Sequence, residues 1–372
     1  MTDIPTTMRA QWLTGHGGLD KLEYHTDVPV PKPGAGEVLI RVRACGMNNT
    51  DINTRTAWYS RSVTEGTTAE GGAKGFAGME DGAGSWGREG IGFPRIQGAD
   101  VSGEVVALGE GAPSNLMGKR VMIETWFRDW NDPTDLDKAK YYGSEVDGGY
   151  ADYTIAPVTN VHTHTSAMTD VEIATFATSY ITAENMLARA DVKAGDTVLI
   201  PGASGGVGSA LIQLCHRRGA KTIAMSGASK KDQVAALNPL AVLDREPADL
   251  SAAIKDATGL DSVSVVADVV GGKMFGPFLD VLERGGRYTC AGAIAGPIVE
   301  MDLRTFYLKD LTFTGATVIQ PGLFADLVGY IERGEIKPLI AQTFALKDLR
   351  TAQEAFLAKN HIGNIVIDHS LD

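Results

Sequence analysis

The sequence predicts an α/β protein with two parts: a small antiparallel β-barrel and a parallel sheet covered by helices. The first part holds short strand-like segments separated by Gly and Pro, such as residues 36–43 and 101–109. Beyond residue 190, apolar strand-like segments alternate with helix-like segments, which is typical of βαβ units. The C-terminal segment is expected to return to the barrel.

Length and composition exclude several classes of protein. A chain of 372 residues predicts two domains, and its net charge of −12 argues against a nucleic-acid partner. No apolar run is long enough to span a membrane, and the N-terminus lacks the apolar core of a signal peptide. Three scattered cysteines favour the cytoplasm, and no CxxC pair is present to hold a structural zinc.

Four strands are expected in the first part. Residues 36–43 (GEVLIRVR) alternate between apolar and polar, and residues 101–109 and 119–125 follow the same pattern. Residues 147–157 (DGGYADYTIAP) close this part. Strands this short, separated by turns, favour a barrel with antiparallel pairing.

A long Gly-rich segment interrupts these strands at residues 62–93. A loop of this length in a compact domain is usually disordered or functional, so both interpretations stay open. One is a surface excursion, and the other is a lid over an apolar substrate, for which Trp58, Tyr59 and Trp86 would provide aromatic surface.

The second part contains five apolar strand-like segments with helix-like segments between them. They are residues 196–202, 221–226, 241–245, 262–272 and 285–292. Residues 310–318 (DLTFTGATV) then predict a further strand, a helix-like stretch follows, and the tail ends in NIVIDHS. This order predicts a parallel sheet.

The strongest local motif is a Gly-rich turn between the first of these strands and a helix, VLIPGASGGVGSALIQL, at residues 198–214. Glycines let the backbone approach a pyrophosphate, and the helix N-terminus offers free N–H groups and a favourable dipole. Ala203 replaces the first Gly of the GxGxxG pattern, and a tight turn without a ligand is the alternative. The expected cofactor contacts are Ala203, Ser204, Gly205, Gly206, Val207 and Gly208.

The end of the second strand favours NADPH over NADH, although NADH remains possible. Sites for NAD usually place a carboxylate there to hold the ribose 2′-OH, but this chain has none before Asp232. Ser226 can bond a 2′-phosphate instead, and Lys230 and Lys231 can neutralise it. Arg245, after the third strand, is a second basic candidate. The alternative is that both lysines only begin a solvated helix.

Seven motifs in this order resemble the medium-chain dehydrogenase/reductase superfamily, from about residue 8 to residue 368. They are GEVLIRVRACGMNNTD (36–51), PRIQGADVSGEVVALG (94–109), GGYADYTIAP (148–157), PGASGGVGSALIQL (201–214), DVVGG (268–272), LERGGRYTCAG (282–292) and HIGNIVI (361–367). The resemblance implies a GroES-like β-barrel catalytic domain and a Rossmann domain with a doubly wound parallel sheet. The expected GroES-like domain comprises residues 1–165 and 312–372, and the expected Rossmann domain comprises residues 166–311. The active site would lie in the cleft between them.

The resemblance is to a zinc-free branch of this superfamily. The zinc branch places a catalytic Cys three residues before the Asp of the first motif, where this chain has Asn48 before Asp51. Its next motif has His-Glu after a Gly, where this chain has Ala99-Asp100, and the third ligand position falls near Thr178. Asn, Ala and Thr cannot form a tetrahedral zinc site from nitrogen and sulfur ligands.

The lobe of four cysteines that carries a structural zinc in the zinc branch is also absent from the sequence. An acidic, aromatic insertion occupies residues 127–146 instead. Asn48 together with Ala203-Ser204-Gly205-Gly206 looks most like the quinone oxidoreductase branch. The resemblance therefore implies no zinc.

The expected reaction is NADPH-dependent reduction of a quinone or an α,β-unsaturated carbonyl without a metal. Neutral donors can stabilise the charge that develops on the oxygen of such an acceptor. The candidate catalytic residues are Asn48, Thr50, Asp51 and Tyr59, with Tyr150 as a further donor. The alternatives are that Asn48 only caps a turn, that Thr50 bonds the backbone, and that Asp51 organises loops of the barrel.

The resemblance implies further cofactor contacts outside the Gly-rich turn. Thr182 is the expected packing partner of the nicotinamide, and Gly292 ends the strand beneath that ring. Asn364, which lies with His361 in the C-terminal HIGNIVI motif, is the remaining candidate. A homodimer is expected through residues 310–318 as an edge strand, with a strand buried inside one chain as the alternative.

Two other functions stay open. One is an alcohol dehydrogenase that acquires a metal through His162 or Asp100. The other is a non-catalytic nucleotide-binding protein, because folds of oxidoreductases are sometimes reused for binding.

Overall fold

The computed structural model describes residues 4–76 and 90–371, so Trp86 of the expected lid lies outside the described residues. The chain forms two compact units. The barrel unit comprises Met1–Val63, Ala69–Thr178 and Phe324–Asp372, and the parallel-sheet unit comprises Thr64–Thr68 and Ser179–Leu323. None of the helices in the described part of the chain is long and apolar enough to cross a membrane.

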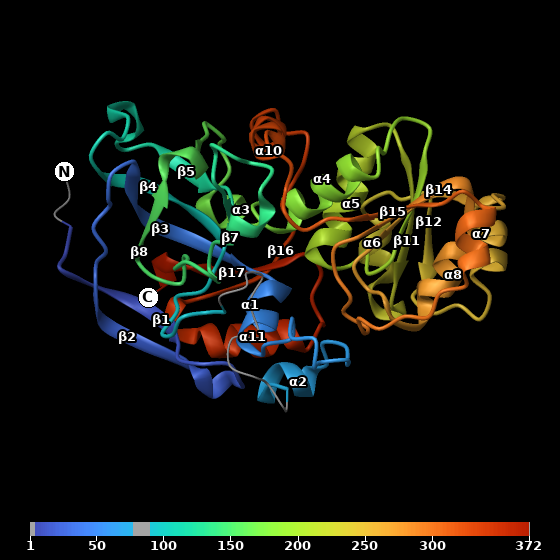
Figure 1. The fold of residues 1–372 in the computed structure, drawn as a ribbon, viewed down its shortest axis with the longest axis horizontal. Coiled ribbons are helices and arrows are strands. Elements are labelled where there is room, and N and C mark those ends of the chain that lie inside the picture. Colours follow the sequence, from blue (N-terminus) through green and yellow to red (C-terminus); the bar gives the residue numbers. More distant parts are fainter. Residues whose placement is uncertain (1–3, 77–89, 372) are drawn as a thin grey trace. The chain divides into compact units, whose positions relative to one another are not determined.

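The barrel unit is built on one sheet of seven strands, in the order β16-β17-β3-β4-β5-β9 with β8 also paired to β3 (Figure 1). Only β16 and β17 are parallel to each other, and the other pairs are antiparallel. The strands are β3 (Glu37–Met47), β4 (Asp100–Leu108), β5 (Arg120–Ile123), β8 (Tyr153–Pro157), β9 (Val161–Thr163), β16 (Ile340–Phe344) and β17 (Asn364–Asp368). The C-terminal strand β17 therefore rejoins the barrel beside β3, as the sequence predicts.

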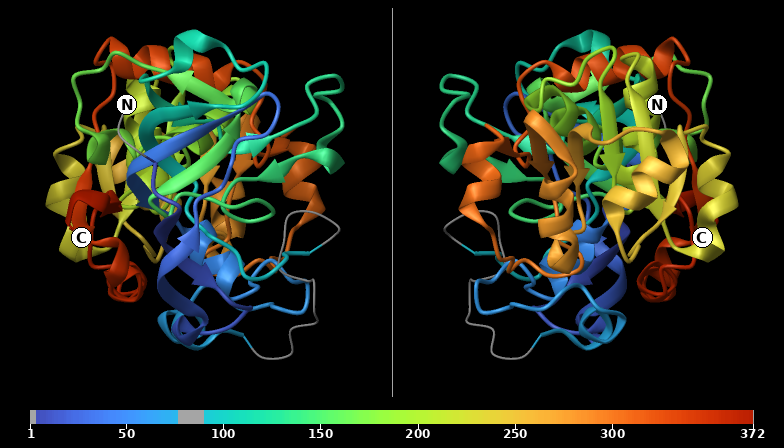
Figure 2. Two further views of the ribbon diagram at one scale, coloured as in Figure 1. Left: turned by 90° about the vertical axis from the view of Figure 1, so that its left-hand side faces the viewer. Right: turned by 90° about the vertical axis from the view of Figure 1, so that its right-hand side faces the viewer.

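In the described part of the barrel unit, two separate strand pairs and five α-helices accompany this sheet. The pairs are β1 (Thr7–Leu13) with β2 (Leu22–Pro29) and β6 (Trp126–Phe127) with β7 (Lys140–Tyr141). The second pair begins at Trp126, just before the 127–146 insertion, and the chain between its strands is mostly exposed and projects from the sheet (Figure 2, left). The helices are α1 (Asn49–Arg55), α2 (Ala69–Lys74), α3 (Asp170–Ile173), α10 (Leu323–Glu332) and α11 (Leu349–Leu357).

The parallel-sheet unit contains one six-stranded sheet in the order β12-β11-β10-β13-β14-β15, and every pair is parallel. The order reverses between β10 and β13, and ligands of such sheets bind at this switch point, outside the carboxyl ends of the strands. The strands are β10 (Thr197–Ile200), β11 (Lys221–Ser226), β12 (Ala241–Asp244), β13 (Val263–Asp268), β14 (Leu282–Cys290) and β15 (Thr312–Gly315).

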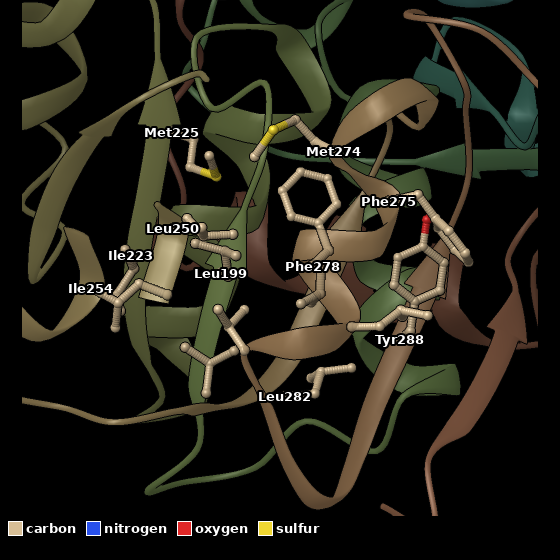
Figure 3. Packing of buried hydrophobic residues seen from close by; sticks show 14 of the residues in the cluster. Leu199, Ile223, Met225, Leu250, Ile254, Met274, Phe275, Phe278, Leu282 and Tyr288 are labelled. Atoms are coloured by element: carbon tan, nitrogen blue, oxygen red, sulfur yellow. The ribbon is translucent and has the colours of Figure 1, made fainter. Parts of the chain in front are cut away.

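Helices cover both faces of this sheet (Figure 1). They are α4 (Ser179–Arg189), α5 (Gly206–Arg217), α6 (Lys231–Ala235), α7 (Leu250–Thr258), α8 (Phe275–Asp280) and α9 (Leu303–Leu308). On one face, Leu199 and Ile223 of the strands pack with Ile254 of α7 and Phe278 of α8 (Figure 3). Each of these buried side chains stabilises the fold by about 1.5–3 kcal/mol relative to exposure to water.

The division into units differs from the expected bounds at residues 165 and 312. Strand β15 pairs with β14, for example Thr289 with Thr314, and so completes the parallel sheet instead of beginning the return to the barrel. The barrel unit extends to Thr178 and resumes at Phe324. The local strand pattern at residues 310–318 does not reveal which sheet a strand joins, because that depends on its partner.

Candidate active site

The turn between β3 and α1 holds the first group of candidate residues. Asn48 is the N-cap of α1, with extended backbone angles of φ −134° and ψ 166°. Its backbone N–H donates to Asp51 Oδ2 at 2.8 Å. A carboxylate in the first turn satisfies a free N–H and interacts favourably with the helix dipole. Asp51 therefore holds this turn together, and the Asn48 amide is directed to another partner.

That partner is Asp100, the first residue of β4. The Asn48 Nδ2 group donates to Asp100 Oδ2 at 3.1 Å, and both side chains are buried. Strands β3 and β4 bring them together because Gly46 pairs with Asp100 in the antiparallel register. Gly46 is needed for a second reason: a Cβ there would lie 2.1 Å from the Ala174 carbonyl oxygen.

Two hydroxyl groups complete this neighbourhood. The Tyr141 hydroxyl lies 2.9 Å from Thr178 Oγ1, and both side chains are buried. The Thr178 hydroxyl also hydrogen-bonds Asp100 and lowers its pKa. We call Asn48, Asp100, Tyr141 and Thr178 the polar cluster. Its members come from the β3–α1 turn, β4, β7 and the segment before α4.

The sequence analysis missed Tyr141. It lies in the 127–146 insertion beside a second tyrosine, Tyr142, and no local pattern distinguishes the two. In the structure, Tyr142 bonds Thr154 within the barrel, whereas Tyr141 reaches Thr178. A contact between residues 37 positions apart in the chain has no signature in the sequence near either of them.

Burial changes the acidity of the carboxyl groups. It raises the pKa of Asp51 to about 6, against the lowering effect of hydrogen bonds from the Asn48 N–H and the Tyr150 hydroxyl. It raises the pKa of Asp100 to about 7, although Thr178 and Asn48 lower it. A buried carboxyl group keeps its proton because its charged form loses hydration. Both groups therefore titrate closer to neutral pH than ordinary aspartates.

Thr50, in the first turn of α1, is hydrogen-bonded to Tyr59. The Tyr59 hydroxyl hydrogen-bonds the side chains of Asn53 and Thr50, and burial raises the pKa of Tyr59 to about 12. Both residues are half-buried. Burial raises the pKa of Tyr141, and the charges of Asp100, Asp51 and Tyr59 raise it further. Of the four predicted catalytic residues, Asn48, Thr50 and Asp51 therefore lie at the start of α1, and Tyr59 is hydrogen-bonded to Thr50.

The donors in this region do not fit a catalytic zinc ion. The positions that hold ligands in the zinc branch carry Asn48, Ala99 and Thr178, and tetrahedral zinc takes thiolate, imidazole and carboxylate ligands. Cys45 is fully buried, and burial raises its pKa well above the usual value, which disfavours the thiolate that binds zinc. Among residues 4–76 and 90–371, no three His, Cys, Asp or Glu side chains are grouped to hold a metal ion.

His162, the histidine considered for a metal, belongs to a different group. Its Nε2 lies 3.3 Å from Glu124 Oε2, and its ring packs on Phe324 with centroids 4.7 Å apart. Glu124 also pairs with Arg128, and both of these side chains are almost completely buried. His162, on β9, therefore contacts the buried Glu124–Arg128 pair that follows β5.

The Gly-rich turn in the parallel-sheet unit has the form that a pyrophosphate needs. Gly202 has φ +66°, a conformation that favours glycine, and the Ala203 N–H donates to the Met225 carbonyl at 3.0 Å. Gly205 is the N-cap of the twelve-residue helix α5. A Cβ on Gly208 would lie 2.3 Å from the Gly202 carbonyl oxygen, so glycine permits the helix to pack against the turn.

The residues expected near a ribose phosphate differ in how far they are buried. Ser226 ends β11 and is buried, whereas Lys231 and Arg245 are exposed. Lys230 is half-buried, burial lowers its pKa, and no carboxylate of the described residues pairs with it. The sequence analysis missed Asp244, which pairs with Ser226 in the β11–β12 register and so brings a carboxylate beside this strand end.

The other expected cofactor contacts lie in both units. Thr182 is half-buried on α4, and Gly292 follows β14, where a Cβ would approach the Val269 carbonyl oxygen to 3.1 Å. Asp268 at the end of β13 accepts hydrogen bonds from the Val270 N–H and the Tyr288 hydroxyl, each at 2.7 Å. Asn364 begins β17, so it belongs to the barrel unit.

The fold and these sites define a two-domain dehydrogenase/reductase. The family model described as alcohol dehydrogenase GroES-like domain matches residues 34–166, and the model described as zinc-binding dehydrogenase matches residues 206–333. The chain belongs to the medium-chain dehydrogenase/reductase superfamily and is an NAD(P)H-dependent oxidoreductase. The predicted family and fold class are confirmed.

Three relatives illustrate the range of this superfamily. A solved structure from Sinorhizobium meliloti 1021, described as a "putative alcohol dehydrogenase", is 45% identical, with a TM-score of 0.89 over 99% of this chain and 98% of that chain. Human quinone oxidoreductase is 26% identical over 355 residues, or 93% of each chain. The cobalt- and zinc-bound thermostable alcohol dehydrogenase from Pyrobaculum aerophilum is 27% identical, with a TM-score of 0.78 over 97% of this chain and 99% of that chain.

Proposed function

We propose that this protein uses NADPH to reduce a quinone or an α,β-unsaturated carbonyl compound, and that it does so without a metal. The observation that carries the proposal is the polar cluster. Where the zinc branch holds its ligands, Asn48 and Thr178 bond Asp100 and Tyr141. The similarity to quinone oxidoreductases supports the same reaction class.

Conjugated acceptors suit a site with neutral donors. They take up hydride at an electron-poor carbon and spread the charge onto a distant oxygen, which hydrogen-bond donors can stabilise. A bound reduced nicotinamide supplies that hydride. In our proposal, the turn at residues 202–208 and the N-terminus of α5 hold the pyrophosphate, while Asn48, Thr50 and Tyr59 bind the acceptor. Asp51 fixes the backbone of Asn48.

A panel of acceptors tests the reaction. With NADPH and a metal chelator present, the purified protein should oxidise NADPH with quinones and enones at least about tenfold faster than with saturated aldehydes and ketones, since conjugated acceptors spread the developing charge themselves and depend less on a Lewis acid. Absorbance loss of NADPH measures the rate. Equal rates with saturated carbonyls, or activity that the chelator abolishes, would exclude this proposal. Binding of NADPH without turnover of any acceptor would favour the non-catalytic alternative.

The cofactor preference rests on Lys230 and Ser226. Lys230 carries a charge that no described carboxylate neutralises, which suits a 2′-phosphate, whereas Asp244 beside Ser226 disfavours one. We expect Lys230→Ala combined with Lys231→Ala to weaken NADPH binding by about tenfold, the typical value of one or two charge-assisted hydrogen bonds. NADH binding should change by less than about twofold. Fluorescence titration with both cofactors measures this, and equal losses would argue against a 2′-phosphate site.

An alcohol dehydrogenase that binds zinc is the second candidate. The 45% identical relative described as a "putative alcohol dehydrogenase" favours it, and the donor set at Asn48, Ala99 and Thr178 argues against it. Metal analysis of the purified protein separates the two candidates. One tightly held zinc ion per chain would support the alcohol dehydrogenase, and less than about a tenth of an ion per chain would support the metal-free reductase.

We also propose a homodimer in the cytoplasm. Strand β15 ends the order of the parallel sheet, and neighbouring α9 exposes Leu303, Tyr307 and Leu308. The three cysteines are free thiols, which is usual in a reducing compartment.

A further inference from the structure

We propose that Thr64–Thr68, a short piece of the Gly-rich insertion, forms a strap that fixes one wall of the site for the nicotinamide half of the cofactor. The strap lies outside all seven family motifs of the sequence. The inference rests on the proposed pyrophosphate site at residues 202–208, and it does not depend on which acceptor is reduced. Gly66 and Thr67 are positioning residues in this assignment, because they act on the cofactor through another loop.

The strap belongs to the parallel-sheet unit, although the chain on either side of it belongs to the barrel unit. Two backbone contacts hold it there. The Thr67 N–H donates to the Ile294 carbonyl oxygen at 2.8 Å. A Cβ on Gly66 would lie 2.5 Å from the same oxygen and 2.9 Å from the Ala295 carbonyl carbon. Only glycine permits so close an approach of two backbone segments, so the strap is fitted to this partner.

The partner of the strap is the loop at residues 291–296, which follows β14. This loop is bonded in turn to residues 269–272, the turn that follows β13. The Ala295 N–H donates to the Val270 carbonyl oxygen at 2.8 Å, and a Cβ on Gly272 would lie 2.9 Å from the Ala295 carbonyl oxygen. The strap, the loop and the turn are therefore in direct contact, in that order.

The turn at residues 269–272 also borders the proposed pyrophosphate site. A Cβ on Gly202 would lie 3.1 Å from Val270 Cγ2. Asp268, the last residue of β13, fixes the turn because its carboxylate accepts hydrogen bonds from the Val270 N–H at 2.7 Å and the Gly271 N–H at 3.1 Å. Strands β10 and β13 flank the switch point of the sheet, where ligands of such sheets bind. The strap is thus connected to the cofactor site through two fixed backbone segments.

The strand order shows which half of the cofactor these segments can contact. A dinucleotide that binds across the switch point extends to both sides of its pyrophosphate. Ser226, the residue expected near the 2′-phosphate, ends β11 and so lies on the adenosine side. The loop and the turn lie on the other side of β10, at the carboxyl ends of β14 and β13. They are therefore placed to contact the nicotinamide half.

The loop needs support because of its composition. Its sequence, AGAIAG at residues 291–296, consists mainly of small residues, and its two glycines have a conformationally permissive backbone. The hydrogen bond from Thr67 and the close packing of Gly66 restrict this backbone before the cofactor binds. A preorganised site binds more tightly, since less conformational entropy is lost when the ligand arrives.

Thr67→Pro removes the N–H of the strap, and Thr67→Ala is the matched control that keeps it. The Thr68 N–H donates to the Gly66 carbonyl oxygen at 2.9 Å, which defines a γ-turn centred on Thr67. Thr67 has a negative φ, and the inverse γ-turn has a central φ of about −75°, close to the value that Pro imposes. We expect Thr67→Pro to weaken NADPH binding by about tenfold, and Thr67→Ala by less than about threefold.

Gly66→Ala tests the close approach by a second route. The new Cβ would force the strap away from the Ile294 carbonyl oxygen, so NADPH binding should again weaken by about tenfold. Gly15→Ala is the control, because a Cβ on Gly15 would meet no atom within 4 Å, and it should leave binding within about twofold. Amide hydrogen exchange should show a protected Thr67 N–H in wild type and a loss of that protection in Gly66→Ala. An unprotected Thr67 N–H in wild type would contradict the docking itself.

A ligand without nicotinamide separates positioning from damage to the fold. Adenosine 2′-phosphate 5′-diphosphate keeps the pyrophosphate and lacks the nicotinamide half, and calorimetry measures its binding beside that of NADPH. Thr67→Pro and Gly66→Ala should change its affinity by less than about twofold while they weaken NADPH by about tenfold. The pair of ADP and NADH gives the same comparison if NADH is the preferred cofactor.

Three results would overturn the inference: equal losses for both ligands, unchanged NADPH affinity in Thr67→Pro and Gly66→Ala, or the same loss in Thr67→Ala. None of these measurements uses an acceptor. If the binding differences are found and no quinone or enone is reduced, the proposed reaction fails and the strap stands. If acceptors are reduced and the differences are absent, the reverse holds.

Discussion

At the scale of single residues, two buried carboxyl groups connect the site to the stability of the barrel unit. Burial raises the pKa of Asp51 to about 6 and that of Asp100 to about 7, whereas an aspartate in an unfolded chain has a pKa of about 3.9. The folded state therefore binds these protons more tightly than the unfolded state does. The free energy of unfolding must then decrease as pH rises from about 4 to about 7, and the loss is complete above the folded pKa values.

Asp100→Asn should remove most of this pH dependence. The amide cannot ionise, so the variant should gain stability relative to wild type by about 2 to 3 kcal/mol between pH 5 and pH 8, because one pKa unit corresponds to about 1.4 kcal/mol. Urea unfolding at both pH values measures the gap. The exposed Asp256 on α7 provides the control Asp256→Asn, which should not change it. Parallel pH profiles for Asp100→Asn and wild type would show that Asp100 ionises freely in the folded state.

At the scale of elements, the turn between β10 and α5 contains two glycines that we expect to differ in their roles, one in folding and one in cofactor binding. A Cβ on Gly208 would lie 2.3 Å from the Gly202 carbonyl oxygen, closer than real side chains approach. A Cβ on Gly205 would meet only that oxygen, at an ordinary 3.5 Å. Gly208 therefore serves the packing of helix on turn, whereas we propose that the open space at Gly205 is where a pyrophosphate approaches.

Gly208→Ala and Gly205→Ala should accordingly have different effects. Gly208→Ala should lower the melting temperature of the protein without cofactor by several degrees and weaken NADPH binding as a consequence, since the clash costs about 1–3 kcal/mol. Gly205→Ala should leave the melting temperature within about 1 °C and still weaken NADPH binding by about tenfold or more. Calorimetry and fluorescence titration check both. Normal NADPH affinity in Gly205→Ala would mean that the pyrophosphate does not approach this residue.

At the scale of the whole molecule, one surface lacks a partner within the described chain. Helix α9 exposes Leu303, Tyr307 and Leu308, and the preceding loop exposes Ile298 and Val299. Large apolar side chains gathered in this way are typical of interaction surfaces. Strand β15 follows α9 and lies at the end of the parallel sheet, with a single partner, β14, among the described strands. A second copy of the chain can extend this sheet.

Negative charges introduced on α9 by mutation should dissociate the expected dimer. Leu303→Glu combined with Tyr307→Glu places two like charges in each copy of the interface, and the exposure of both side chains means that folding should be unaffected. Sedimentation velocity at micromolar protein should show a dimer for wild type and a monomer for the variant. Leu136→Glu, at another exposed apolar site in the barrel unit's insertion, should stay dimeric. A monomeric wild type would refute the homodimer.

The local sequence by itself determined the class of fold and the cofactor turn. Alternation with a period of two predicts strands such as β3 and β4, and glycines between an apolar strand and a helix predict the turn before α5, because both signals depend only on neighbouring residues. The missing ligands at Asn48, Ala99 and Thr178 were also visible in the sequence. The short strands β6 and β7 were not, since two residues carry no periodicity.

Only the tertiary structure decided which side chains lie together at the positions where the zinc branch has its metal ligands. The pairing of Tyr141 with Thr178 joins distant parts of the chain, and Asp244 stands beside Ser226 only because β12 lies next to β11. The same holds for β15, which joins the parallel sheet through β14. The raised pKa values of Asp51 and Asp100 follow from burial, which results from packing of the whole barrel unit. Long-range pairing and desolvation depend on where the chain folds back, and a local pattern of residues does not specify that.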